Sequence, residues 1–167
     1  MEHKIIDTNE VVIRFTGDSG DGMQLTGTLF ADASALYGNE ISTFPDYPAE
    51  IRAPQGTVAG VSGFQVHIGQ TEVKTPGDFC DVLVAMNPAA LKANAKWAKP
   101  GASIILDEDS FDEKGLEKAG FKTNDPIEEM NLKDYHIIWA PITTLTKESL
   151  KDSGLDNKSI VRSKNMF

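Results

Sequence analysis

The chain has 167 residues, of which 40% are hydrophobic and 25% are charged, a composition typical of a globular domain and not of a disordered segment. A formal net charge of −9 excludes nucleic acid and anionic membranes as main partners, because both require a basic protein surface. The single cysteine excludes an intrachain disulfide and a cysteine-rich zinc or iron–sulfur site. No apolar run approaches the roughly 20 residues of a membrane span, so we expect a cytoplasmic protein.

The first half of the chain predicts three strands, one helix and one long loop. Residues 10–16 are rich in β-branched side chains and predict a strand, and residues 22–37 carry apolar positions three or four apart, as one helix face requires. A short strand is expected at 40–44. A loop with three prolines follows at 45–56, and a further strand at 57–68 completes this half.

The second half alternates strands with helices. In chain order we expect a strand at 81–86, a helix at 87–99, a strand at 102–108, a helix at 110–121, a strand at 135–141, a helix at 143–154 and the start of another at 156–167. The strands 81–86 and 102–108 are continuous apolar runs, which is typical of strands buried on both faces of a sheet. The pattern predicts an α/β fold, a single Rossmann-like doubly wound domain with a mostly parallel sheet and helices on both faces.

The turn at 17–22 contains three glycines between the first strand and the first helix. In a doubly wound sheet, ligands bind at the carboxyl ends of the strands, where a helix N-terminus offers N–H groups to a phosphate. The spacing matches neither the G-x-G-x-x-G fingerprint nor a Walker loop, and Asp18 and Asp21 would repel a phosphate unless they turn outward. A tight turn in which Ser19 or Asp21 caps the helix explains the same residues.

The loop at 45–56 gathers side chains that are frequent in interfaces. Phe44, Tyr47, Glu50 and Arg52 lie close together on a segment that its prolines stiffen. In an extended segment the glutamate and the arginine would point the same way and engage another surface together. A surface ion pair of small energetic worth is the alternative interpretation.

The sequence shows no catalytic group of recognisable spacing. Its three histidines, His3, His67 and His136, lie far apart and lack metal-ligand spacing, so we expect no metal site. Cys80 precedes an apolar strand and is interpreted as a buried small residue, not a nucleophile. Asn87 follows that strand at the same sheet edge as the glycine turn, where it either caps the next helix or lines the crevice.

Four segments together resemble one family, the gamma module of 2-oxoacid:ferredoxin oxidoreductases. More narrowly, they resemble the version fused to the N-terminus of the alpha subunit in the 2-oxoglutarate type. The segments are RFTGDSGDGMQLTG, ISTFPDYPAEIRAPQGTVAGVSGFQVHIG, TPGDFCDVLVAMNPAAL and APITTLTKESLKDSGLDNKSIVRSKNMF. The resemblance runs from about Val11 to Phe167. The chain departs from the wider family's G-x-G-G-Q-G at Ser19 and Asp21, and has Ala53-Pro54 where that family often has two glycines.

The resemblance implies a function. In that family the enzyme oxidatively decarboxylates a 2-oxoacid on thiamine diphosphate, transfers the acyl group to coenzyme A and passes electrons through iron–sulfur clusters to ferredoxin. Thiamine diphosphate, magnesium and the clusters belong to other modules, whereas the gamma module supports assembly and has been linked to coenzyme A. The residues implied to face a ligand or an interface are Gly17, Asp18, Ser19, Gly20, Asp21, Gly22, Glu50 and Arg52.

The resemblance also implies a domain division and partners. Residues 1–9 are expected to be an N-terminal tail, and residues 10–167 a gamma-type domain, interpreted as a fragment of a longer alpha subunit. Its partners would be the remaining alpha modules and the beta subunit, with ferredoxin as acceptor of the full enzyme, and the isolated fragment would be inactive and could form a homodimer. The alternative is a free-standing nucleotide- or CoA-binding domain. An NAD-linked dehydrogenase is disfavoured because the dinucleotide fingerprint is not met.

Overall fold

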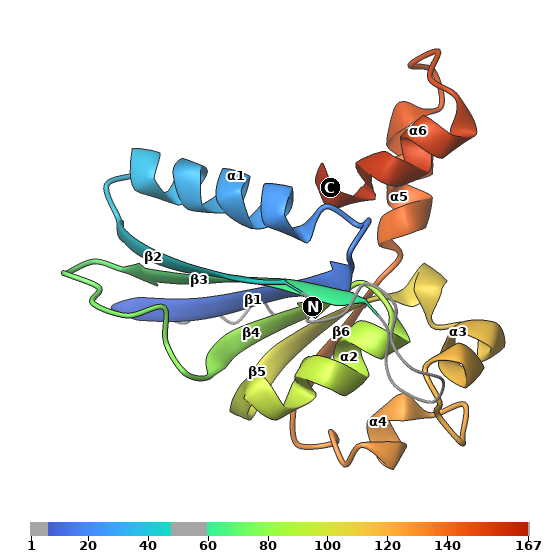
Figure 1. The fold of residues 1–167 in the computed structure, drawn as a ribbon, viewed down its shortest axis with the longest axis horizontal. Helices are drawn as coiled ribbons and strands as arrows, with labels where there is room; N and C mark the ends of the chain where they lie inside the picture. The colour runs from blue at the N-terminus through green and yellow to red at the C-terminus, as the bar shows by residue number, and fades with distance from the viewer. Residues whose placement is uncertain (1–6, 48–59, 167) are drawn as a thin grey trace.

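Six strands form one sheet in the computed structural model, which describes residues 7–47 and 60–166 (Figure 1). The strands are β1 Glu10–Asp18, β2 Glu40–Asp46, β3 Val61–Gly69, β4 Cys80–Ala85, β5 Ala98–Asp107 and β6 His136–Ala140. Their order across the sheet is β2-β3-β1-β4-β5-β6. The α-helices are α1 Met23–Leu36, α2 Pro88–Asn94, α3 Glu113–Lys118, α4 Pro126–Glu129, α5 Ile142–Leu150 and α6 Asn157–Arg162. Short 3-10 turns lie at Ala95–Trp97, Glu108–Ser110 and Ser163–Met166.

The sheet is mostly parallel, as the sequence predicts. β1, β4, β5 and β6 pair in parallel, whereas β3 is antiparallel to both of its neighbours, β1 and β2. The β2–β3 pairing matches Glu40 with Gly69 and Asp46 with Gly63. An antiparallel pair needs no crossover helix, and the sequence shows no helical pattern between these two strands. Five of the six strands therefore run in one direction.

Helices cover both faces of the sheet, which confirms the predicted α/β architecture. In Figure 1, α1 lies across one face and α2 across the other. α1 buries Met23, Gly27 and Ala31, three positions four residues apart, and the core on its face includes the buried Phe64 and Val66 of β3. The core on the α2 face is larger. It contains fully buried apolar side chains of α2, β4 and β5, among them Leu83, Leu91, Ile104 and Leu106.

Several predicted boundaries differ from the structure, and three of them have a clear physical reason. The first strand does not end before Gly17 but continues to Asp18, because β3 and β1 pair as far as Val61 and Asp18. The helix predicted at 87–99 ends at Asn94, and β5 begins at Ala98 because Cys80 of β4 pairs with that residue. The sequence analysis missed α4, although Asp125 caps it and proline occupies its first turn, a visible helix-start signal. Among the described residues, no helix is both long and apolar enough to cross a bilayer.

Gly27 allows α1 to approach the sheet closely. A Cβ atom built on Gly27 would lie 2.1 Å from a ring carbon of Phe64, which is closer than packed atoms can approach. We predict that Gly27→Val lowers the free energy of unfolding by about 2–3 kcal/mol, measured by urea denaturation, because the helix or the ring must move. Gly20→Val is the matched control, since no atom of the described residues lies within 4 Å of its added Cβ. Equal stability of the two variants would contradict this packing.

Candidate functional site

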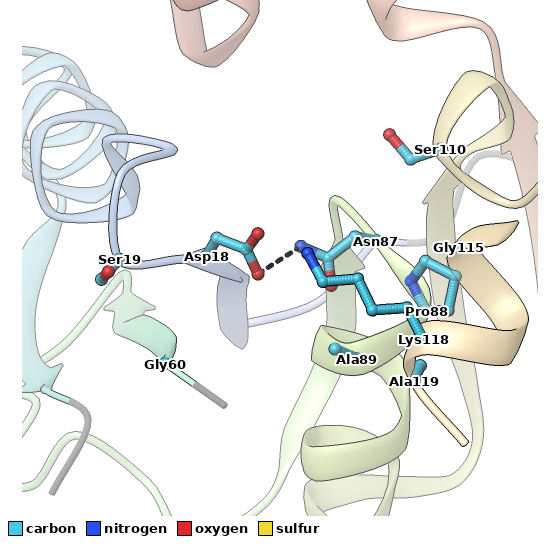
Figure 2. Close-up of a pocket in the computed structure, with 10 residues that line it drawn as sticks. All are labelled: Asp18, Ser19, Gly60, Asn87, Pro88, Ala89, Ser110, Gly115, Lys118 and Ala119. Carbon is cyan, nitrogen blue, oxygen red and sulfur yellow. Dashed lines mark hydrogen bonds between the residues drawn. The ribbon is translucent and has the colours of Figure 1, made fainter. Parts of the chain in front are cut away.

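A cavity of about 460 Å³ opens at the carboxyl ends of β1 and β4. The helices that follow these two neighbouring parallel strands, α1 and α2, lie on opposite faces of the sheet (Figure 1), and this arrangement is where doubly wound proteins bind ligands. The volume lies within the range of roughly 300–1,000 Å³ that is usual for small-molecule sites. The lining residues, drawn in Figure 2, are Asp18, Ser19, Gly60, Asn87, Pro88, Ala89, Ser110, Gly115, Lys118 and Ala119.

Backbone hydrogen bonds fix the glycine turn. The Asp18 N–H donates to the Asp21 carboxylate at 3.0 Å, and the Asp21 N–H donates to the Asp18 carbonyl at 2.9 Å. The Ser19 N–H donates to the Gly60 carbonyl at 2.9 Å. Gly22 precedes α1 with a φ of 74°, a conformation that favours glycine, and no side chain of the described residues caps the helix. The alternative that Ser19 or Asp21 caps α1 is therefore wrong, because Gly22 occupies that position and Asp21 bonds backward to Asp18.

The structure separates the predicted site residues into two groups. Asp18 and Ser19 line the cavity, whereas Gly17, Gly20, Asp21 and Gly22 do not. Asp21 and Gly22 face the C-terminal segment, residues 163–166. The Asp21 carboxylate lies 3.2 Å from the Lys164 ammonium, and the Cα of Gly22 faces the Asn165 side chain.

Glu50 and Arg52, the other two predicted site residues, lie outside the residues that the structure describes. Whether they face a ligand or an interface stays a prediction. Of the same loop, Phe44 and Tyr47 are described, and both side chains are exposed.

Asn87 both caps a helix and borders the cavity, so the two interpretations of this residue hold together. Its side-chain oxygen accepts a hydrogen bond from the Ala90 N–H at 2.8 Å, which begins α2. Its Nδ2 donates to the Asp18 carboxylate at 2.9 Å, the dashed contact in Figure 2. One residue therefore joins the end of β4 to the end of β1 and holds one oxygen of the Asp18 carboxylate.

Lys118 brings a positive charge to the cavity that the sequence analysis missed. It belongs to the last turn of α3, and its side chain lines the cavity together with Ser110 (Figure 2). No local pattern indicates this contact, because Lys118 lies 100 residues after Asp18 and belongs to an ordinary amphipathic helix. The glycine turn and the helix after it contain no lysine of their own.

The buried acid of the sheet has a structural function. Asp107, at the end of β5, is fully buried, and its carboxylate accepts hydrogen bonds at 2.9 Å from the Ser110 and Thr143 hydroxyls. Asp109 accepts a second pair of hydrogen bonds from the backbone N–H and hydroxyl of Thr144. Both acids thus satisfy the first N–H groups of α5, where negative charge is favourable. Both oxygens of the Asp107 carboxylate thus accept hydrogen bonds from neighbouring residues.

Two further titratable candidates, Cys80 and His67, are buried. Cys80 is fully buried, which confirms its interpretation as a core residue, and burial raises the pKa of its thiol to about 11. Such a thiol carries almost no nucleophilic thiolate near neutral pH. His67 Nδ1 lies 2.7 Å from the Thr75 carbonyl, to which it donates. Within residues 7–47 and 60–166, no three side chains of His, Cys, Asp or Glu gather as a metal site would require.

The chain is similar to a known family and to a curated protein along nearly its whole length. Residues 12–167 match the model of the family described as pyruvate ferredoxin/flavodoxin oxidoreductase. The 2-oxoglutarate oxidoreductase subunit KorA of Mycobacterium tuberculosis is 52% identical over 157 residues, which make up 94% of this chain and 24% of KorA. The chain therefore spans about a quarter of the length of this curated relative.

Two solved structures share the fold of this chain. A 2-oxoglutarate:ferredoxin oxidoreductase from Magnetococcus marinus, with 2-oxoglutarate, coenzyme A and succinyl-CoA bound, matches with a TM-score of 0.67 and 26% identity, over 96% of this chain and 23% of that chain. The gamma subunit of a keto/oxoacid ferredoxin oxidoreductase from Geobacter sulfurreducens matches with a TM-score of 0.61 and 20% identity, over 93% of this chain and 71% of that one. Because the identity is only 20%, the match to the Geobacter sulfurreducens subunit shows the fold alone.

Asn87 should contribute more stability than the acid that it contacts. We predict that Asn87→Ala lowers the free energy of unfolding by about 1–2 kcal/mol, because α2 loses its cap and the link to β1 breaks. Asp18→Ala removes only the exposed hydrogen bond to Asn87 and should lower the free energy of unfolding by less than about 1 kcal/mol. Urea denaturation of both variants measures the difference. Equal losses would contradict the double function of Asn87.

Cys80 should give the stability a distinct pH dependence. Its pKa rises from 9.0 to about 11 on burial, so the unfolded chain loses the thiol proton at lower pH than the folded chain does. We predict that this part of the free energy of unfolding is present below pH 9 and falls as the pH rises toward 11. The control, Cys80→Ala, should lack this component. If the free energy of unfolding changed with pH in the same way for both proteins between pH 9 and 11, this prediction would be contradicted.

Proposed function

Because this chain belongs to the pyruvate ferredoxin/flavodoxin oxidoreductase family, we propose that it is the gamma domain of a 2-oxoglutarate:ferredoxin oxidoreductase. The observation that supports this proposal most strongly is the 52% identity to a 2-oxoglutarate oxidoreductase subunit across 94% of the chain. The whole enzyme would convert a 2-oxoacid and coenzyme A into an acyl-CoA and carbon dioxide and pass the released electrons to ferredoxin. Residues 10–167 would form the gamma domain, and residues 1–9 its N-terminal tail.

The domain itself would support the reaction without performing it. Thiamine diphosphate, magnesium and the iron–sulfur clusters would belong to the other alpha modules and the beta subunit. The one cysteine of this chain is fully buried, so it offers no ligand to a cluster. We therefore expect the isolated chain to be inactive with 2-oxoglutarate, coenzyme A and ferredoxin, and to act in the cytoplasm as part of an assembly.

The crevice between β1 and β4 would supply part of the coenzyme A site. Coenzyme A carries phosphates, and the first N–H groups of α1 lack a side-chain cap among the described residues. Lys118 adds a positive charge on the opposite side of the cavity. The two acids of the turn are already engaged, Asp18 by Asn87 and Asp21 by Lys164, so that their repulsion of a phosphate is reduced. The residues fit an anionic ligand.

The residues of the glycine turn would have different functions in ligand binding. Gly20 follows the cavity-lining Ser19, and no atom of the described residues lies within 4 Å of a Cβ built on it, so it would allow a ligand to approach the backbone. Asp18 and Ser19 would contact the ligand from the cavity wall, and Gly17 and Gly22 would permit the bend of the chain. Glu50 and Arg52 would anchor either the ligand or a neighbouring module.

An apolar stripe on α1 supports the assembly function. Leu25, Leu29, Ala33 and Leu36 follow one another at spacings of four, four and three residues and are all exposed, on the side of the helix opposite its buried residues. Leu36 is 89% exposed, and α1 contains one charged side chain, Asp32, in 14 residues. A helix that faced water would carry more charge. We propose that this stripe packs against another module of the enzyme, which a free-standing CoA-binding domain would not require.

Titration calorimetry at low salt tests the coenzyme A site. We predict that this chain binds coenzyme A, that Gly20→Val abolishes binding and that Lys118→Gln weakens it by about tenfold, because one charged contact is worth about 1.4 kcal/mol or more. Lys114→Gln is the matched control, since it removes the same charge from the same helix outside the cavity. Equal affinity of all four proteins would contradict this placement. Absence of binding by the parent chain would leave the domain with the assembly function alone.

Co-purification tests the assembly function. When this chain is co-expressed with the remaining alpha modules and the beta subunit, we predict that Leu29→Glu prevents their association, because a charge would be buried in an apolar contact. Ala35→Glu adds the same charge to the same helix, away from the stripe, and should leave the complex intact. Association of the Leu29→Glu variant at the level of the parent chain would contradict the proposed interface.

A further inference from the structure

The C-terminal segment of the chain folds back onto the glycine turn. The segment Ser163–Met166 lies beside the first turn of α1, and Figure 1 shows the C-terminal end of the chain next to the start of that helix. The Thr26 hydroxyl donates to the Asn165 carbonyl at 2.7 Å. A Cβ on Gly22 would lie 2.2 Å from Asn165 Nδ2, so a larger residue at this position, where φ is 74°, would displace the Asn165 side chain. These contacts join residues that are about 140 positions apart in the sequence.

The same segment places a cation against the acid of the turn. Lys164 Nζ lies 3.2 Å from one oxygen of Asp21, and the other oxygen accepts from the Asp18 N–H at 3.0 Å. The pair is largely shielded from water, since the two side chains are 14% and 18% exposed. An ion pair in such a place is screened less than a surface pair, and removal of one partner leaves the other charge uncompensated.

We propose that Lys164 is a positioning residue for the glycine turn. It cancels the charge of Asp21 and, together with Asn165, holds the turn in the shape that an anionic ligand would meet. This inference rests on the proposed function, because it concerns the same crevice. Lys164 does not line the cavity, so it would act through Asp21 without touching the ligand.

The electrostatic part of this proposal predicts that two substitutions, each of which removes one charge of the ion pair, have opposite effects on the affinity for coenzyme A. Lys164→Gln leaves Asp21 as an unpaired negative charge beside the turn and should weaken binding of coenzyme A by about tenfold at low salt, with a smaller difference at high salt. Asp21→Asn keeps an oxygen that can accept from the Asp18 N–H but removes the charge, so affinity should equal or exceed that of the parent. In the double variant, the affinity should return to within about threefold of the parent. A purely structural contact would not produce this reversal.

Hydrogen exchange provides a readout that does not depend on the ligand. The backbone amides of residues 18–22 should exchange faster in Lys164→Gln than in the parent chain, because the turn loses its C-terminal support. Lys151→Gln, which removes an exposed charge at the end of α5, is the matched control for both measurements and should change neither.

The combined outcomes separate the two proposals. Faster exchange in Lys164→Gln and opposite effects on affinity support the inference. If the parent chain does not bind coenzyme A, the proposed coenzyme A site fails, and the exchange data alone decide whether Lys164 positions the turn. Unchanged exchange and unchanged affinity in Lys164→Gln would overturn the inference. If Lys164→Gln does not fold, the affinity of Asp21→Asn for coenzyme A tests the electrostatic part of the proposal. An affinity well below that of the parent chain would overturn that part.

Discussion

The parallel pairing of β1 with β4 is the constraint on which the rest of this structure depends. The register aligns Ile13 with Val82 and Thr16 with Ala85, and the Thr16 hydroxyl donates to the Val84 carbonyl at 2.8 Å. Because α1 and α2 leave these strands on opposite faces, neither of these helices covers the edge between them, and the cavity opens there. The hydrogen bond between Asn87 and Asp18 spans the same two strand ends. A change in this register would remove the cavity.

Charge compensation explains how an acidic turn can lie in a proposed anion site. A protein with a net charge of −9 has few cations to spare, yet two lysines from distant segments come close to the turn. Lys118 reaches the cavity from α3, and Lys164 reaches Asp21 from the C-terminal segment. Neither position could be inferred from the turn itself. Asp21 is thereby paired with a lysine, and the Asp18 carboxylate accepts a hydrogen bond from Asn87.

The sequence predicted most of the fold but only part of the site. Strands 81–86 and 135–141 were found within one residue of their observed bounds. The apolar run of the first reflects its burial inside the sheet, whereas the second is an edge strand with mostly exposed side chains. The early start of β5 at Ala98 was missed because pairing with Cys80 decides it, not local preference. The same holds for Lys118 and Lys164. Their contribution comes from the packing of distant elements, which no local pattern encodes.

The most direct measurement of the central claim is a map of coenzyme A on this chain by NMR. The ¹⁵N-labelled protein is titrated with coenzyme A, and the shifts of its backbone amides are followed residue by residue. The account predicts saturable changes at residues 18–22, at Asn87 and at Lys118, all around the β1–β4 crevice, and none at β6 on the far edge of the sheet. Changes confined to another surface, or none at any concentration, would contradict the claim that this domain contributes to the coenzyme A site.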